Sequence, residues 1–227
     1  MPTDTSEKGL ETLIVESLIH EADYLPGSNE DFDRDHAVDL AHLLAFLKAT
    51  QPKVVESLGI ETDGPSRQQF LHRLQGEIAK RGVIDVLRKG IKHGAASLNL
   101  FYGTPTPGNA RAVELFQANR FSFTRQLHYS KDETQLALDL GVFINGLPVA
   151  TFELKNKLTK QTVADAVTQY IRDRDPKELL FQFGRCVVHF AVDDHKVQMC
   201  THLTGGASSP SSSTRPIPAR AAGPLLR

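Results

Sequence analysis

The chain has 227 residues, of which 40% are hydrophobic and 23% charged, and its formal net charge is -1. This apolar share excludes a wholly disordered chain, and the length allows one domain with or without an appendage. No stretch reaches the ~18 consecutive apolar residues that a membrane span needs, and the start lacks an apolar secretory segment. We therefore expect a soluble protein that carries no targeting signal.

Charge is distributed unevenly along the chain. Residues 1–35 hold ten acidic and two basic residues, so the part that follows is mildly basic and permits a polyanionic partner. Cys186 and Cys200 form no CxxC pair, which predicts core thiols in a reducing compartment. The nine histidines show no metal-binding spacing.

The N-terminal half is predicted to be helical. Apolar residues recur at helical spacing within residues 10–18, 38–47 and 70–78. Proline and glycine predict a loop between 95 and 110, and residues 111–118 suit one more short helix.

From Phe121 onward the pattern changes to strands rich in β-branched and aromatic residues. The predicted strands are 121–129, 134–144, 148–155, 186–192 and 197–203, with one clear helix at 163–174. Strands joined by short turns must be antiparallel, so the pattern predicts an α/β fold with a mixed sheet flanked by helices. We expect one domain over residues 1–204, with a helical part at about 7–120 and a core at about 121–204.

The last residues differ in composition from all that precede them. Serine, proline and glycine fill half of the segment from Thr204 onward, which predicts disorder over 205–227. The change is abrupt, so a further hypothesis is that the chain is truncated or read out of frame beyond about Gly205. Sequencing of the coding DNA tests it.

The segment 135–156 is predicted to form a hairpin whose register decides which polar residues meet. A two-residue turn at 145–146 places Asp139 opposite Phe152, whereas a three-residue loop at 145–147 places Asp139 opposite Glu153. The second register unites the apolar faces of the two strands, which puts alternate residues of the first strand on one face. Burial therefore favours the three-residue loop.

In that register two carboxylates oppose each other at about 5 Å between Cβ atoms. Asp139 and Glu153 so placed favour a cation between them, with Lys155 alongside. The alternative is that Glu153 and Lys155 lie on the solvated face of an edge hairpin, and spacing alone favours this alternative.

Asp139, the Glu153-Leu154-Lys155 run and the helix that follows resemble the PD-(D/E)xK nuclease core. More closely, the chain resembles the N-terminal endonuclease region of the type I restriction enzyme R subunit over roughly residues 7–204. The segments that carry this resemblance are NGLPVATFELKN (145–156), QTVADAVTQYIRDRDPKELLFQFGRCVVHFAVDD (161–194) and DRDHAVDLAHLLAFLKATQP (33–52). It implies a restriction-endonuclease-like fold.

The resemblance also implies a magnesium site. Asp139 and Glu153 would bind Mg²⁺ with the Leu154 carbonyl, and Lys155 would position the attacking water. Magnesium suits such a site because it takes one or two protein carboxylates and keeps several waters.

Two further positions follow from the resemblance. Gln169 matches the glutamine of a Gln-x3-Tyr motif, but Asp173 stands four residues on, at the tyrosine position. Tyr170 is no substitute, because helical spacing places it on the apolar face of the helix. Gln169 would position DNA or water, or else be a plain solvated side chain. Glu7 or Glu11 could supply the acid that the family places on the first helix, although both also suit a helix N-terminus.

The partners that the resemblance implies are double-stranded DNA and the methylation and specificity subunits, in the cytoplasm. Basic residues near the site are expected to contact phosphates: Lys157, Lys160, Arg172, Arg174 and Arg185. The family's full subunit uses ATP, but this chain shows no GxxxxGK[ST] phosphate loop.

These observations predict a metal-dependent DNA endonuclease module of a type I restriction system. Cleavage in the family depends on the motor and on the other subunits, so the isolated chain need not be active. The alternatives are another PD-(D/E)xK nuclease, such as a resolvase or repair nuclease, and a non-catalytic remnant that docks subunits or DNA.

Overall fold

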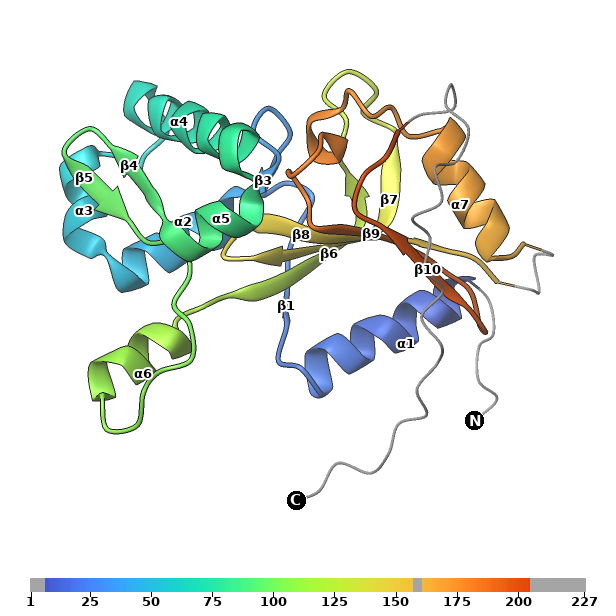
Figure 1. Ribbon diagram of the computed structural model, residues 1–227, viewed down its shortest axis with the longest axis horizontal. Coiled ribbons are helices and arrows are strands. Elements are labelled where there is room, and N and C mark those ends of the chain that lie inside the picture. The colour runs from blue at the N-terminus through green and yellow to red at the C-terminus, as the bar shows by residue number, and fades with distance from the viewer. Residues whose placement is uncertain (1–6, 157–160, 205–227) are drawn as a thin grey trace.

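The structure is a computed structural model, and it describes residues 7–156 and 161–204. At its centre lies a six-stranded sheet with the strand order β1-β6-β7-β8-β9-β10 (Figure 1). β1 runs parallel to β6 and β9 parallel to β8, whereas the other three neighbouring pairs are antiparallel. The predicted α/β fold with a mixed sheet is confirmed. The strands are β1 (Leu25–Pro26), β6 (Phe121–His128), β7 (Ala137–Ile144), β8 (Leu147–Leu154), β9 (Val188–Val192) and β10 (Val197–Cys200).

The five strands predicted from Phe121 onward are all present, with ends within three residues of the predicted ones. The first strand of the sheet, β1, was not predicted, because two residues that include a proline are too short to show alternation. The predicted loop at 95–110 is wrong at its start. Residues Ala96–Leu98 form β5, which pairs with β4 (Ile91–His93) in a hairpin.

The N-terminal half is helical as predicted, with a second short strand pair, β2 (Phe32–Asp33) and β3 (Val38–Asp39), between the first two helices. The helices of this half are α1 (Glu7–His20), α2 (Leu40–Thr50), α3 (Pro52–Leu58), α4 (Pro65–Arg81), α5 (Val83–Lys89) and α6 (Ala110–Gln117). The predicted helix that follows β8 is α7 (Val163–Arg172). None of the helices in the described ranges is long and apolar enough to span a membrane.

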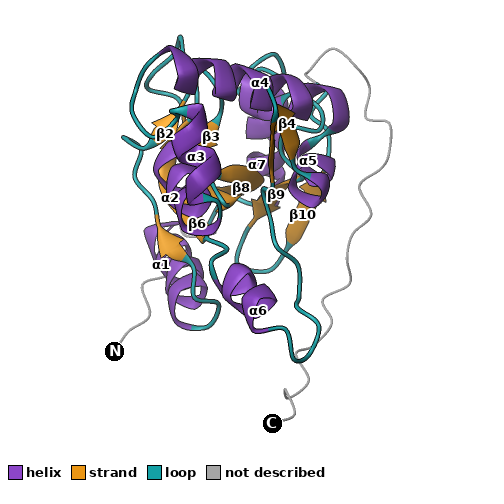
Figure 2. Cartoon of the chain, turned by 90° about the vertical axis from the view of Figure 1, so that its left-hand side faces the viewer, coloured by secondary structure: helices purple, strands orange, loops and turns teal. Residues whose placement is uncertain are grey.

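The helices bury apolar residues in three places around the sheet. α1 packs on one face through Val15, and α7 packs on the other face through Ala166 and Tyr170 (Figure 1). Helices α2 to α5 enclose a third cluster at one end of the sheet, and Figure 2 looks onto this end. The cluster includes Leu147 of β8, so the helical half and the sheet share a core.

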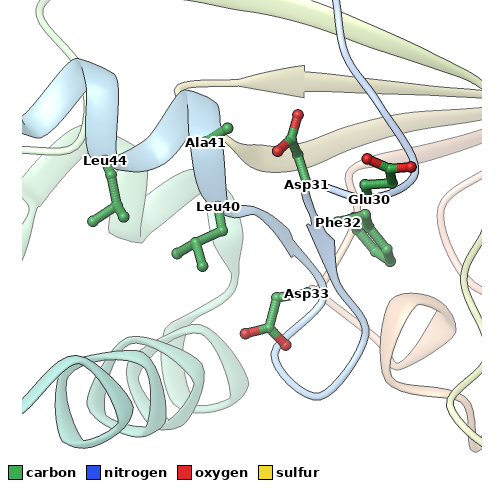
Figure 3. A pocket seen from close by; sticks show the side chains of 7 residues that line it. All are labelled: Glu30, Asp31, Phe32, Asp33, Leu40, Ala41 and Leu44. Carbon is green, nitrogen blue, oxygen red and sulfur yellow. The ribbon is translucent and has the colours of Figure 1, made fainter. Parts of the chain in front are cut away.

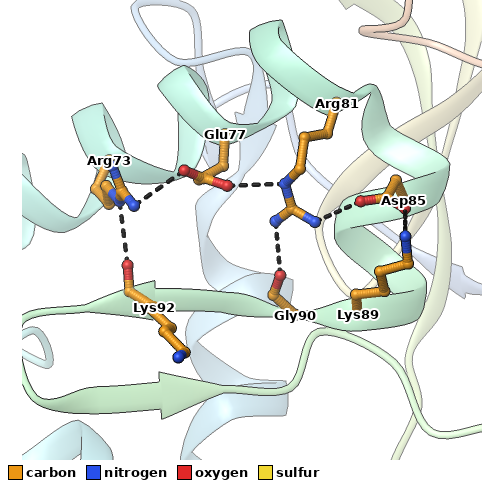
Figure 4. Close-up of polar contacts among 7 residues, drawn as sticks. All are labelled: Arg73, Glu77, Arg81, Asp85, Lys89, Gly90 and Lys92. Atoms are coloured by element: carbon orange, nitrogen blue, oxygen red, sulfur yellow. Dashed lines mark hydrogen bonds and ion pairs between the residues drawn. The ribbon is translucent and has the colours of Figure 1, made fainter.

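Alternating charges tie α4 and α5 to the β4–β5 hairpin, as Figure 4 shows. Arg73 and Arg81 also donate to the main-chain oxygens of Lys92 and Gly90, at 3.1 and 2.8 Å. These contacts fix the position of the hairpin against α4. The residues of the ion-pair chain are, in order, Arg73, Glu77, Arg81, Asp85 and Lys89.

Candidate active site

The β7–β8 hairpin places the two predicted acids opposite each other, as predicted, but its turn and its strand pairing differ from the predicted ones. Its turn has two residues, 145–146, because Ile144 pairs with Leu147, so the predicted three-residue loop is wrong. A β-bulge farther along then shifts the register by one residue, and Leu140 pairs with Phe152. A β-bulge inserts one extra residue in one strand. Here it changes the pairing from the register of the two-residue turn to the register that was predicted for the three-residue loop.

The two-residue turn forms because both of its residues take left-handed backbone conformations. Asn145 has φ 51° and Gly146 has φ 79°, as a type I′ turn requires. The Asn145 side chain is buried, donates to the Leu100 carbonyl at 2.9 Å and accepts from the Arg120 N–H at 2.6 Å. A Cβ at Gly146 would lie 2.3 Å from the Asp39 oxygen, so the turn packs too closely for any other residue.

Asp139 and Glu153 are each one position beyond the last paired residues, so the ladder as it continues places them opposite each other. Asp139 is half-buried. Its Oδ2 accepts a hydrogen bond of 2.7 Å from the main-chain N–H of Leu154, the residue after Glu153. This bond ties the Asp139 carboxylate to the end of β8, where the Glu-x-Lys run lies.

The predicted common apolar face of the first strand is divided at Asp139. Leu140 and Val142 pack in the cluster with α1, whereas Leu138 packs in the cluster with α7. In a regular strand, residues two apart lie on the same face. The alternation is therefore interrupted between Leu138 and Leu140, at the level of Asp139.

Glu153 is fully buried, and one basic side chain neutralises it. Arg174 donates from Nε to Glu153 Oε1 at 2.8 Å, and its Nη2 lies 2.6 Å from the same oxygen in the ion pair. The same guanidinium donates to the Ala137 carbonyl and to the Tyr129 hydroxyl, at 2.7 and 3.2 Å. Burial raises the pKa of Glu153 to about 7, although Arg174 and Lys155 oppose that rise.

The residue after Leu154 continues the sheet before the chain leaves it. The main-chain N–H of Lys155 donates to the Val192 oxygen of β9 at 2.8 Å, and its half-buried side chain is near enough to Glu153 to lower the pKa of that carboxyl. The structure therefore brings Asp139, Glu153 and Lys155 together at the ends of β7 and β8.

The helix that follows the site places its polar residues as expected. Thr162 and Asp165 form a capping box at the start of α7, in which the Thr162 N–H donates to Asp165 Oδ2 at 2.7 Å. Gln169 is half-buried, and Asp173, which ends the helix, is exposed. Tyr170 is buried on the apolar face, as predicted, and its hydroxyl lies 2.8 Å from Thr151 Oγ1.

The basic residues near the site fall into two groups. Arg172 is exposed, whereas Lys157 and Lys160 lie outside the described residues. Arg174 is not placed as a phosphate contact, because it is 4% exposed and bonds within the protein through all three of its nitrogens. Arg185 is also buried and donates to the His36 carbonyl.

An acid of the first helix reaches the site. Glu11 of α1 is 5% exposed and accepts from Arg125 Nε at Oε1 and from Gln126 Nε2 at Oε2, the latter at 3.1 Å. Gln126 also donates to Asp139 Oδ1 at 3.3 Å. The role of Gln126 had no signal in the sequence, because nothing in a strand pattern distinguishes it from a solvated glutamine.

One observation indicates that a divalent cation fits this arrangement. Glu153 Oε2 is buried and has no hydrogen-bond partner within the described residues. A buried carboxylate oxygen without a donor is a costly feature that a cation would relieve. Within those residues no group of three or more Asp, Glu, His or Cys side chains converges as a ready-made metal cage, so the fit is to an ion that needs two carboxylates and otherwise binds water.

Two surface cavities of the described residues lie apart from these acids. One, of about 250 Å³, is lined by β2, the two residues before it and α2, and its lining includes the acids Glu30, Asp31 and Asp33 (Figure 3). The other, of about 290 Å³, lies between α4 and the β4–β5 hairpin. Neither shares a residue with the site.

A mixed sheet with two acids at the ends of adjacent strands, and a lysine two residues after the second acid, defines a nuclease-like α/β protein. The chain belongs to the family described as "Type I restriction enzyme R protein N terminus", whose model matches residues 4–208. The predicted family is thereby confirmed.

A curated relative carries a related name. The chain is 24% identical, over 179 residues, to the "Putative type I restriction enzyme MjaIXP endonuclease subunit" of Methanocaldococcus jannaschii. The match covers 76% of this chain but 16% of that protein, so the chain spans about one sixth of the length of the relative.

Proposed function

We propose that this chain is a metal-dependent DNA endonuclease module of a type I restriction-modification system, and that it hydrolyses phosphodiester bonds. The observation that carries the proposal is the unpartnered, buried Oε2 of Glu153, which lies opposite Asp139 and beside Lys155. Asp139, Glu153 and the Leu154 carbonyl would hold Mg²⁺. When bound, Mg²⁺ stabilises charge on the phosphoryl oxygens and lowers the pKa of its water.

The side chains around the acids have the other roles in the proposed reaction. The Lys155 ammonium orients the attacking water and stabilises charge as it develops on the phosphate. Arg174 fixes Glu153 through Oε1, so that Oε2 faces the site in one orientation. Gln169 of α7 is half-buried and contributes, in this proposal, to positioning DNA or water.

Duplex DNA would be bound through its phosphates by Arg172 at the end of α7 and by Lys157 and Lys160 between β8 and α7. The proposed partners are the methylation and specificity subunits, which would supply recognition of the DNA sequence, and the proposed compartment is the cytoplasm.

A second candidate is a module that docks DNA or subunits without catalysis. The observation that favours it is the ion pair with Arg174, which already satisfies one oxygen of Glu153. The two candidates differ in whether the chain binds a divalent cation at these acids and cleaves DNA.

Lysine substitution separates the candidates. Supercoiled plasmid is incubated with the chain, Mg²⁺, ATP, the motor part of the family's full subunit and the methylation and specificity subunits, and nicking is followed on a gel. The proposal expects nicking by the wild type and by Lys196→Met, an exposed lysine of the β9–β10 turn, and its loss in Lys155→Met. Equal nicking by the wild type and Lys155→Met contradicts the assigned role of Lys155. No nicking by a wild type that still binds the duplex favours the docking module.

A further inference from the structure

Strand β6 contains a residue in a conformation that strands do not normally use. Gln126 has φ 46°, although its neighbours Arg125 and Leu127 pair with β7 in the regular register. That register puts Gln126 level with Asp139. A left-handed backbone at a residue other than glycine is unfavourable, and it persists only where the surroundings impose it.

The surroundings that impose it come from one side chain. Asn29 donates from Nδ2 to the main-chain oxygens of Arg125 and Gln126, at 3.2 and 3.0 Å, and accepts at Oδ1 from the His128 N–H, at 2.8 Å. β1 pairs with β6 only as far as Phe123, so Asn29 takes the place of a neighbouring strand along the next part of β6. The left-handed turn is therefore held by side-chain bonds to the main chain.

The consequence is that two successive side chains of β6 reach the same carboxylate. Successive side chains of a regular strand lie on opposite faces, yet Arg125 and Gln126 both donate to Glu11, one to each oxygen. Gln126 has a second bond to Asp139 Oδ1. One amide nitrogen thus links an acid of α1 to an acid of β7 at distances of 3.1 and 3.3 Å.

We propose that Gln126 is a positioning residue, and that its left-handed conformation, imposed by Asn29, holds Asp139, an acid of the proposed cation site, in a fixed position against Glu11. The inference rests on the proposed function, since it concerns the same site. Each carboxylate oxygen that accepts from Gln126 keeps a second lone pair, so the amide orients the acids without using up their capacity to bind an ion. Partners that orient metal ligands in this way commonly contribute strongly to affinity.

A glycine at position 126 separates the contribution of the side-chain amide from that of the backbone conformation. Gln126→Gly removes the amide but adopts a positive φ without strain. Asn29→Ala leaves all the acids and Gln126 in place and removes only bonds to the main chain. Asp23→Gly is the matched control, because Asp23 is an exposed residue outside strand β6 whose φ, 55°, is also positive.

The readouts are Mn²⁺ affinity, from the electron paramagnetic resonance signal of free Mn²⁺, and thermal unfolding of the same samples. We expect the Kd for Mn²⁺ to rise about tenfold in Gln126→Gly and in Asn29→Ala, and to stay unchanged in Asp23→Gly. The unfolding temperature of Gln126→Gly should stay close to that of the wild type.

An unchanged Kd in folded Gln126→Gly overturns the inference while the proposed function stands. If Gln126→Gly does not fold, the Kd of Asn29→Ala for Mn²⁺ decides whether the inference holds. This variant keeps the Gln126 side chain and removes only the hydrogen bonds that Asn29 makes to the main chain of β6. A wild type that binds no Mn²⁺ contradicts the proposed function itself, and the positioning role falls with it.

Discussion

Arg174 directs two of its nitrogens at a single oxygen of Glu153. Nε and Nη2 lie 2.8 and 2.6 Å from Oε1, whereas Oε2 has no partner in the part of the chain that the structure describes. A fork that contacts both carboxylate oxygens would have satisfied Glu153 completely. The one-sided arrangement compensates the buried charge and leaves one oxygen available in a defined direction.

Removal of the guanidinium should expose the cost of burying Glu153. Arg174→Met leaves the Glu153 carboxylate without its compensating charge, so we expect the free energy of unfolding to fall by about 3–5 kcal/mol. Chemical denaturation at pH 8, above the raised pKa of Glu153, measures it.

The control for this change is Arg172→Met, two residues earlier and exposed, which should alter stability by no more than about 0.5 kcal/mol. Adding Glu153→Gln to Arg174→Met should recover part of the loss, because the unpaired charge is gone. Equal losses in Arg172→Met and Arg174→Met would refute the assignment of a buried ion pair.

The raised pKa of Glu153 predicts a definite dependence of stability on pH. Between its ordinary value near 4.5 and about 7, the folded chain holds a proton that the unfolded chain has released. Wild-type stability relative to Glu153→Gln should therefore be greatest below pH 4.5 and decline as pH rises to about 7, by up to about 3 kcal/mol.

The glutamine of Glu153→Gln does not titrate. The difference in the free energy of unfolding between the wild type and this variant, taken at each pH, therefore cancels the titration of the other groups. The loss of the ion pair with Arg174 adds an offset, and the slope with pH carries the prediction. Denaturation curves at pH 4.5, 6 and 7.5 suffice, and a difference that rises with pH would have the wrong sign.

The sequence was most informative where burial dictates the outcome. Leu140 and Val142 of β7 must cover the same core as Ala150 and Phe152 of β8, so the register at the acids was predictable even though the turn was not. The Asn-Gly turn and the apolar register favour different pairings. The protein keeps both and resolves the conflict with a bulge, which no alternation pattern reveals.

Other features of the site depend on tertiary contacts between distant segments. Arg174 follows α7 by two residues, and in the sequence it resembles a solvated basic residue. The chain turns there, however, and the guanidinium donates hydrogen bonds to the Ala137 carbonyl and the Tyr129 hydroxyl. The left-handed conformation of Gln126 depends on Asn29, 97 residues away. Such contacts have no local signal, so the acids of the site were predictable but not the residues that hold them.

The turn itself offers a further test. Asn145→Ala removes hydrogen bonds to the Leu100 carbonyl and the Arg120 N–H. Alanine at this position also has to adopt a positive φ without the side-chain hydrogen bonds that offset its cost in asparagine. We expect a loss of about 2–4 kcal/mol in the free energy of unfolding, since the buried Leu100 carbonyl and the partly buried Arg120 N–H each lose a partner. Thermal and chemical unfolding would measure it.

Asn145→Gly separates the two causes. Glycine accepts the positive φ but forms none of the side-chain bonds, so its stability should lie between those of the wild type and Asn145→Ala. Equal stability of the wild type and Asn145→Ala would show that the turn is not held by this side chain.

Direct titration of Mn²⁺ into the purified chain tests most directly whether the opposed carboxylates bind a cation. The account predicts that the wild type binds, that Asp139→Asn and Glu153→Gln each lose at least about tenfold in affinity with the fold retained by circular dichroism, and that Lys155→Met binds as the wild type does. Mn²⁺ binding that survives unchanged in both carboxylate variants, or that is absent from the folded wild type, would contradict it.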